Sequence, residues 1–234
     1  EDVQFIFSPD FERDDPPVGR FVHIGYTYDY IIPKVRYLDR SVEIRRNLEN
    51  AGARFVLCFF DEGSADLWNS FTADANSAEE YRFLLNWLLE DPTLGIILKP
   101  KRPSILSKRL RAIEDLIDRA KNTGRCYFMM NEGETLRSNY YPSEAAMAAD
   151  VCIGRLSGVT AALEARLAGA RALLANSPKC GMSYGSMHPF YDWGLSHVVF
   201  KEWDTLRDTV NFYRQEPQTQ PNFGNWDAGI SHLD

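Results

Sequence analysis

The chain has 234 residues, of which 44% are hydrophobic and 25% are charged, a balance typical of a globular protein that buries a core. Its net charge of −7 and its lack of basic runs argue against nucleic acid as a partner. Because it has neither a signal peptide nor an apolar run of membrane-spanning length, we expect a cytoplasmic protein without a transmembrane segment. Any association with the inner face of the membrane would be peripheral, through a domain outside this chain.

Strand and helix patterns alternate along the chain. Residues 1–40 are interpreted as an N-terminal strand and a linker, and residues 41–234 as one domain. The predicted strands cover residues 21–26, 54–60, 94–98, 125–129, 151–154, 170–175 and 197–200. The predicted helices cover residues 40–51, 77–90, 104–122, 143–148 and 202–214, and a further helix ends at residue 168.

This alternation predicts an α/β fold, a Rossmann-like parallel sheet with helices on both faces. In such a sheet, ligands bind at the carboxyl ends of the strands, where the strand order reverses. Ser77 and Glu80 have the spacing of a capping box at the start of the helix 77–90. The chain begins at Glu1 without Met, so we expect a piece of a longer protein.

Neither the cysteines nor the histidines have the spacing of metal ligands, so the sequence predicts no metal site and no cofactor. Most of the cysteines lie in or beside apolar runs, which predicts buried free thiols in a reducing compartment. The four cysteines are Cys58, Cys126, Cys152 and Cys180.

The most informative segment is a turn of small residues between a strand and a helix. Ser157, Gly158 and Thr160 make this turn, which leaves backbone N–H groups directed at one point that attracts a phosphate. Ser157 or Thr160 is expected to cap the helix, and Gly158 lets a ligand approach the backbone. Glu164, one helical turn further on, could accept hydrogen bonds from the two hydroxyls of a ribose. The alternative is a capped surface helix with a solvated glutamate.

Charged residues follow two other predicted strands. Lys99, Lys101 and Arg102 come directly after strand 94–98, which indicates a phosphate or carboxylate site, with Lys99 the strongest candidate. The alternative is a solvated turn. Asp61 and Glu62 follow the most apolar strand and could bind a sugar hydroxyl, a metal or a proton in transit. A single acidic pair is weak support for a metal, and an acidic loop is the alternative.

Two loops add further candidates. His188 lies in residues 179–194, a stretch rich in Gly, Ser and aromatic residues of the kind that often carries function. A structural or solvated histidine is the alternative there. Tyr141 precedes a short predicted helix, where an aromatic ring and free backbone groups could stack on a base or pair with its edge. A packed start of that helix is the alternative.

Several of these segments resemble one family. The runs YPSEAAMAADVCIGRLSGVTAALEARLAGARALLA, IILKPK, VVFKEWDTLRDTV and FGNWDAGISHLD resemble the nucleotide-binding half of GT-B glycosyltransferases. They are similar in particular to bacterial surface-polysaccharide transferases and the related glycerophosphate polymerases. The resemblance covers residues 54–234. It implies that residues 41–234 are a nucleotide-sugar-binding domain and that residues 1–40 are a remnant or a part of an acceptor-side domain. Arg155 stands where the glycerophosphate polymerases often have Asp, which counts against that subgroup.

The resemblance implies a role for each matching residue. Ser157, Gly158 and Thr160 would bind the donor diphosphate, Glu164 the donor ribose, and Lys99 the phosphate or the donor sugar. The partners would be a nucleotide-sugar donor and a saccharide or lipid-linked saccharide acceptor.

Residue reasoning and resemblance together give one hypothesis, a glycosyltransferase of bacterial cell-surface polysaccharide synthesis. The candidate catalytic residues are Lys99, Glu62 and His188, and the candidate donor-binding residues are Ser157, Gly158, Thr160, Glu164, Tyr141 and Lys101. A sugar-nucleotide epimerase of the same architecture and a non-catalytic α/β scaffold domain are the alternatives.

Overall fold

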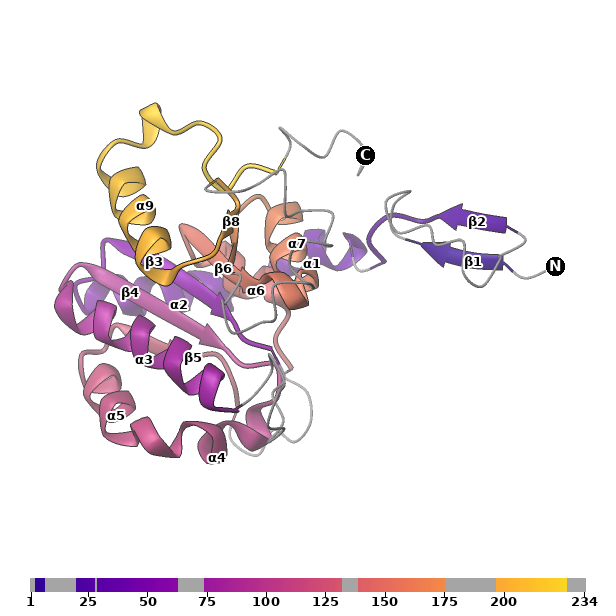
Figure 1. Ribbon diagram of the computed structural model, residues 1–234. Coiled ribbons are helices and arrows are strands. Elements are labelled where there is room, and N and C mark those ends of the chain that lie inside the picture. The colour runs from indigo at the N-terminus through magenta and orange to yellow at the C-terminus, as the bar shows by residue number, and fades with distance from the viewer. Residues whose placement is uncertain are drawn as a thin grey trace.

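The computed structural model describes residues 3–6, 20–27, 29–62, 74–131, 139–175 and 197–226. Most of them form one body around a six-stranded sheet. A separate two-stranded parallel sheet, made of β1 (Val3–Ile6) and β2 (Arg20–His23), projects from one side of this body (Figure 1). The strand predicted at residues 21–26 is therefore real but shorter. It pairs with β1 instead of joining the main sheet, a partner that the sequence pattern did not reveal.

The main sheet confirms the predicted fold class. All its neighbouring strands are parallel, in the order β5-β4-β3-β6-β7-β8, so the order reverses between β3 and β6. The strands are β3 (Phe55–Phe60), β4 (Leu94–Lys99), β5 (Cys126–Phe128), β6 (Val151–Arg155), β7 (Arg171–Ala175) and β8 (Val199–Phe200). Each agrees with a predicted strand to within two residues at either end.

Helices cover both faces of this sheet (Figure 1). One face packs on α3 (Asp74–Glu90), α4 (Leu106–Leu110), α5 (Glu114–Asn122) and α9 (Trp203–Gln215). The other face packs on α2 (Asp39–Asn50), α6 (Pro142–Met147) and α7 (Thr160–Leu167). Strand β3 is buried from both sides, because Leu57 and Phe59 face the first layer while Val56, Cys58 and Phe60 face the second. This explains its almost unbroken apolar sequence.

Shorter helical segments join these elements. They are η2 (Asp29–Ile31), α1 (Ile32–Val35), η3 (Pro103–Ile105), η4 (Arg111–Ile113), η5 (Leu156–Gly158) and η6 (Pro217–Thr219). No helix within the described ranges has both the length and the apolar character that crossing a membrane demands. Among the cysteines, Cys58, Cys126 and Cys152 are buried free thiols as predicted, and Cys180 lies outside the described residues.

Two helix predictions are wrong in detail. The capping box is wrong because α3 begins at Asp74, which places Ser77 and Glu80 inside the helix, where both are buried. The predicted helix 104–122 is divided, because the backbone leaves the helical region at Leu110 (φ −100°, ψ 8°) and Ile113 (φ −130°, ψ 21°). Leu106, Leu110 and Ile113 of this segment are nevertheless buried in the same core cluster, since helical periodicity determines which face is buried and not whether the helix is continuous.

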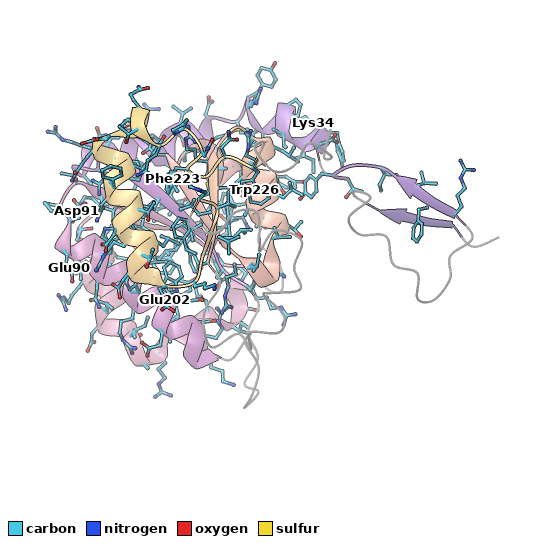
Figure 2. All side chains as sticks on the ribbon, turned by 45° about the horizontal axis from the view of Figure 1, so that its top comes forward. Lys34, Glu90, Asp91, Glu202, Phe223 and Trp226 are labelled. Atoms are coloured by element: carbon cyan, nitrogen blue, oxygen red, sulfur yellow. The ribbon has the colours of Figure 1, made fainter. Side chains whose placement is uncertain are left out.

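The segment after α9 returns to the sheet beside β7. The Gly224 carbonyl accepts a hydrogen bond from the backbone N–H of Ala172 at 3.3 Å, and the Trp226 indole N–H donates to the Ala172 carbonyl at 2.7 Å. Figure 2 shows Phe223 and Trp226 within the body of the molecule, where both side chains are almost fully buried. This segment therefore lies along the amino half of β7, while β8 pairs with its carboxyl half at Leu174 and Ala175.

Candidate functional site

A cavity of about 320 Å³ opens at the carboxyl ends of β3 and β4, against the start of α7. This position is next to the reversal of strand order, where ligands of open α/β sheets bind. Seven of the residues singled out in the sequence line it together: Asp61, Glu62, Lys99, Lys101, Gly158, Thr160 and Glu164. The remaining lining residues are Tyr26, Phe60, Pro142 and Ala161.

Glu164 is one of the buried carboxylates that line the cavity. Its Oε1 accepts hydrogen bonds from the backbone N–H of Ser143 at 2.9 Å and from the Ser143 hydroxyl at 2.7 Å. Its Oε2 accepts a hydrogen bond from the Tyr26 hydroxyl at 2.9 Å. Since only 4% of Glu164 is exposed, the alternative of a solvated surface glutamate is wrong.

The position of Glu164 follows from how closely α7 packs on β6. A methyl group built on Gly154 of β6 would lie 2.9 Å from Cβ of Ala162 on α7, so the strand and the helix touch at these two small residues. Ala162 and Ala165 of α7 are buried in the core between this helix and the sheet. Glu164, which lies between them in sequence, is buried beside the cavity. Small residues in the sequence thus set the depth at which this carboxylate lies.

The start of α7 differs from the prediction. Its N-cap residue is Val159, in a helical conformation (φ −57°, ψ −24°), and there is no side-chain cap hydrogen bond at this position. The expected cap from Ser157 or Thr160 is therefore wrong, because η5 runs directly into α7 without an extended residue between them. Gly158 and Thr160, at this helix start, nevertheless line the cavity, and the first backbone N–H groups of a helix have no partner within it.

The two lysines reach the cavity from the end of β4. Lys99 is the last residue of this strand and is 8% exposed, so its charge lies in a largely desolvated position. Lys101 is more exposed and forms an ion pair with Glu62 across the cavity mouth. Two cations beside a helix start can interact with an anionic group such as a phosphate.

Glu62 and Gly158 lie in direct contact. A Cβ built on Gly158 would be 1.7 Å from Oε1 of Glu62, so only a glycine leaves room for the carboxylate in this position. The side chain of Glu62 is 15% exposed. A carboxylate therefore lies over the turn that precedes α7, next to Lys101.

Asp61, the first of the two adjacent acids, lines the cavity but is buried and makes several hydrogen bonds within the protein. Its Oδ1 accepts a hydrogen bond from the backbone N–H of Lys101 at 2.5 Å. Its Oδ2 accepts hydrogen bonds from the Tyr81 hydroxyl at 2.9 Å and from the Arg109 guanidinium at 3.0 Å. Asp61 thus fixes the loop that carries Lys101, and its charge is matched by the equally buried Arg109.

A second buried ion pair lies beside the first. Arg155, at the end of β6, places its Nε 3.1 Å from Oε1 of Glu80 on α3. Burial raises the pKa of Glu80 to about 7, the positive charge of Arg155 opposes this rise, and the negative charge of Asp61 adds to it. Burial, together with Asp61, also raises the pKa of Tyr81 well above its usual value. Arg155 is therefore paired with Glu80 inside the fold and does not line the cavity.

The other predicted residues fall outside the cavity or outside the described residues. Tyr141 is the N-cap residue of α6 and is 42% exposed, and it is not part of the cavity lining. Ser157 adjoins Gly158 in η5, and its side chain lies outside the described residues, as does all of His188. Among the residues described, no group of three or more His, Cys, Asp or Glu side chains could hold a metal ion.

Sequence reasoning missed Tyr26, Phe60, Pro142 and Ala161 as lining residues. A signal existed for Tyr26 and Phe60, because each ends a predicted strand, and side chains at strand ends of a parallel sheet border its ligand sites. Nothing in the sequence indicated that Tyr26 and Glu164, which are 138 residues apart, share a hydrogen bond.

The same architecture occurs in solved structures of glycosyltransferases. Anabaena Alr3699/HepE in complex with UDP and glucose matches with a TM-score of 0.51 and 15% identity, over 82% of this chain and 47% of that chain. A UDP-forming α,α-trehalose-phosphate synthase from Burkholderia xenovorans matches with a TM-score of 0.51 and 13% identity, over 88% of this chain and 46% of that one. An α,α-trehalose-6-phosphate synthase from Burkholderia multivorans matches with a TM-score of 0.51 and 13% identity, over 92% and 46%.

The likeness is one of fold. These structures are GT-B glycosyltransferases, and the chain spans about half the length of each of them. No protein-family model matches the sequence, and a comparison with curated proteins gives no match. The six-stranded parallel sheet with helices around it is thus the Rossmann-like arrangement found in these enzymes.

Proposed function

We propose that this chain binds the nucleotide-activated sugar of a glycosyltransferase reaction. The observation that carries the proposal is the cavity at the ends of β3 and β4, which brings together Lys99, Lys101, the start of α7 and the buried Glu164. Two cations and a helix start suit a diphosphate, and a buried carboxylate suits the hydroxyls of a sugar ring.

The proposed chemistry is transfer of a glycosyl group. The bond between the anomeric carbon and the diphosphate breaks, a bond to an acceptor hydroxyl forms, and the proton of that hydroxyl leaves to a base. Lys99 and Lys101 would stabilise the charge that develops on the leaving diphosphate. Glu62 and His188 are the candidates for carrying the proton.

The acceptor and pathway belong to the same proposal. The resemblance of the YPSEAAM…ARALLA segment to surface-polysaccharide transferases favours a saccharide or lipid-linked saccharide acceptor in bacterial polysaccharide synthesis. HepE was solved with UDP, and the trehalose-phosphate synthases are UDP-forming, so a uridine nucleotide is the first donor to test here.

The test is a binding screen with UDP, CDP and GDP, read as thermal shift and then by isothermal titration. We expect one of these nucleotides to stabilise the fold, by about 2.7 kcal/mol at a ligand concentration of 100 times Kd. Glu164→Ala should weaken that binding, whereas Glu43→Ala, on the exposed side of α2, should not. If none of the three stabilises the chain, the proposal is wrong for these nucleotides, and the scaffold alternative further predicts no thermal shift with any nucleotide. Release of a free sugar without an acceptor would instead indicate an epimerase.

A further inference from the structure

We infer that Tyr81 and Arg109 are positioning residues for Lys101, and that they act through Asp61. Both lie in helices that pack on the sheet, Tyr81 in α3 and Arg109 in α4, and neither lines the cavity. The inference rests on the proposed function, because Lys101 is one of the two cations proposed to meet the donor phosphates. It extends that function from the cavity lining to the side chains behind the lining.

Asp61 holds the chain where β4 ends. Its backbone N–H donates a hydrogen bond to the Lys99 carbonyl at 3.3 Å, and its Oδ1 accepts one from the Lys101 N–H at 2.5 Å. Pro100, between the two lysines, has no N–H to donate. The carboxylate of Asp61 therefore takes over from the backbone ladder at the point where the chain leaves the sheet, and it fixes the backbone of Lys101.

The orientation of this carboxylate is set from two helices. Oδ2 of Asp61 accepts hydrogen bonds from the Tyr81 hydroxyl at 2.9 Å and from the Arg109 guanidinium at 3.0 Å. All three residues are at most 5% exposed, so these bonds form away from water, where hydrogen bonds to a charged group are strong. A rotation of the carboxylate away from Lys101 would break one or both of these bonds. Tyr81 and Arg109 thus determine where Oδ1, the oxygen bonded to Lys101, lies.

Lys101 depends on such support more than Lys99 does. Lys99 is the last residue of β4 and pairs in register with Phe60 of β3, so the sheet holds its backbone. Lys101 lies beyond the sheet, its side chain is 56% exposed, and its ammonium group pairs with Glu62. Because the backbone is held, only the side chain has to reorient when Lys101 exchanges Glu62 for a phosphate. This limits the conformational entropy that is lost on binding.

The first test needs no ligand. Tyr81→Phe removes one hydrogen bond to Asp61 and keeps the ring, which packs edge-to-face on Phe59 with the ring centroids 5.7 Å apart. Relative to the amides of β4, the amide hydrogen of Lys101 should then exchange with solvent about threefold to tenfold faster, as expected for the loss of one hydrogen bond. Ile44→Val, in α2 on the other face of the sheet, is the control for a general loss of stability and should leave this ratio unchanged.

The second test measures UDP affinity by isothermal titration. Tyr81→Phe should weaken UDP binding about threefold in the wild type. It should have no effect in combination with Lys101→Met, and its full effect in combination with Lys99→Met. A general structural role of Tyr81 would instead weaken binding equally in all three backgrounds. Arg109→Lys, which keeps the charge that the buried Asp61 requires, should follow the pattern of Tyr81→Phe.

The outcomes separate this inference from the proposed function. If Tyr81→Phe leaves the relative exchange of the Lys101 amide unchanged, the inference is wrong, whatever UDP does. If UDP binds and Tyr81→Phe changes its affinity equally in all three backgrounds, or in none, the inference is also wrong and the donor site stands. If UDP does not bind the wild type, the uridine donor is wrong, and faster exchange in Tyr81→Phe still supports the positioning of Lys101.

Discussion

Ser143 donates two hydrogen bonds to a single oxygen of Glu164, from its backbone N–H at 2.9 Å and from its hydroxyl at 2.7 Å. The pair joins the first turn of α6 to the middle of α7 in a region where both residues are almost completely buried. Glu164 is therefore held by the fold before any ligand arrives. A carboxylate oriented in advance loses little freedom when it binds a hydroxyl.

The first prediction concerns this pair. Ser143→Ala removes one of the hydrogen bonds and should lower the free energy of unfolding by about 1–3 kcal/mol, because a buried carboxylate loses a donor. It should also weaken UDP binding, since Glu164 is then less firmly oriented. Urea denaturation and isothermal titration measure the two effects. Ser104→Ala, at an exposed serine of η3, is the control, and equal stability of the two variants would contradict the prediction.

The second prediction concerns the charge of Lys99. Lys99→Met keeps most of the buried aliphatic volume and removes the cation, so UDP affinity should fall by about tenfold or more. The dependence of UDP affinity on salt concentration should also become weaker, because one charge fewer faces the phosphates. Lys108→Met, on the exposed side of α4, should leave both quantities unchanged. A salt dependence equal to that of the wild type would place Lys99 outside the phosphate site.

The sequence was sufficient for the sheet, because buried parallel strands are continuous apolar runs separated by helical periodicity. It also indicated that Lys99 and Glu164 would lie near each other, and both line one cavity, since strand ends and helix starts in such a fold converge on one edge. Gly52, which follows α2, has φ +104°, as is common for a glycine after a helix C-terminus. These features depend on residues close to one another in sequence.

The rest depends on contacts between distant segments. The adjacent acids Asp61 and Glu62 look equivalent in the sequence, yet Asp61 pairs with the buried Arg109 while Glu62 pairs with the exposed Lys101. The difference arises because Arg109 of α4, 48 residues after Asp61 in the chain, donates a hydrogen bond to Asp61. In the same way, Glu80 looked like a capping residue until the fold placed Arg155 beside it. The spacing of residues within one helix cannot show which side chains of a neighbouring element will contact it.

The third prediction concerns the contact between β6 and α7. Gly154→Ala places a methyl group 2.9 Å from Cβ of Ala162, so α7 must shift, and stability should fall by about 1–3 kcal/mol. Ala162→Gly alone should cost about 1 kcal/mol through helix propensity. The double variant should be more stable than the sum of the two effects implies, because the second change makes room for the first. Urea denaturation of all four proteins gives this coupling, and strict additivity would contradict the prediction.

The fourth prediction concerns pH. The pKa of Glu80 is about 7 in the folded protein, against 4.5 as its ordinary value. Between these values the unfolded chain loses this proton while the folded protein keeps it, so the contribution of Glu80 to stability falls as pH rises from about 4.5 to about 7. Above pH 7 the contribution no longer changes.

Glu80→Gln cannot ionise and should show a weaker decline in stability over this interval. Denaturation midpoints at a series of pH values measure it. Glu79→Gln, its exposed neighbour on α3, should keep the decline seen in the wild type. A decline of the same steepness in Glu80→Gln would assign the titration to another group.

The return of the chain to β7 after α9 protects the protein from self-association. Strand β8 has only two residues and covers only the carboxyl half of β7. Without the segment that carries Gly224 and Trp226, the backbone groups of Ala172 in the amino half of β7 would lose these hydrogen-bond partners. An exposed strand edge with unpaired backbone groups can pair with strands of other molecules. A chain shortened before Phe223 should therefore aggregate even though it keeps every residue of the cavity.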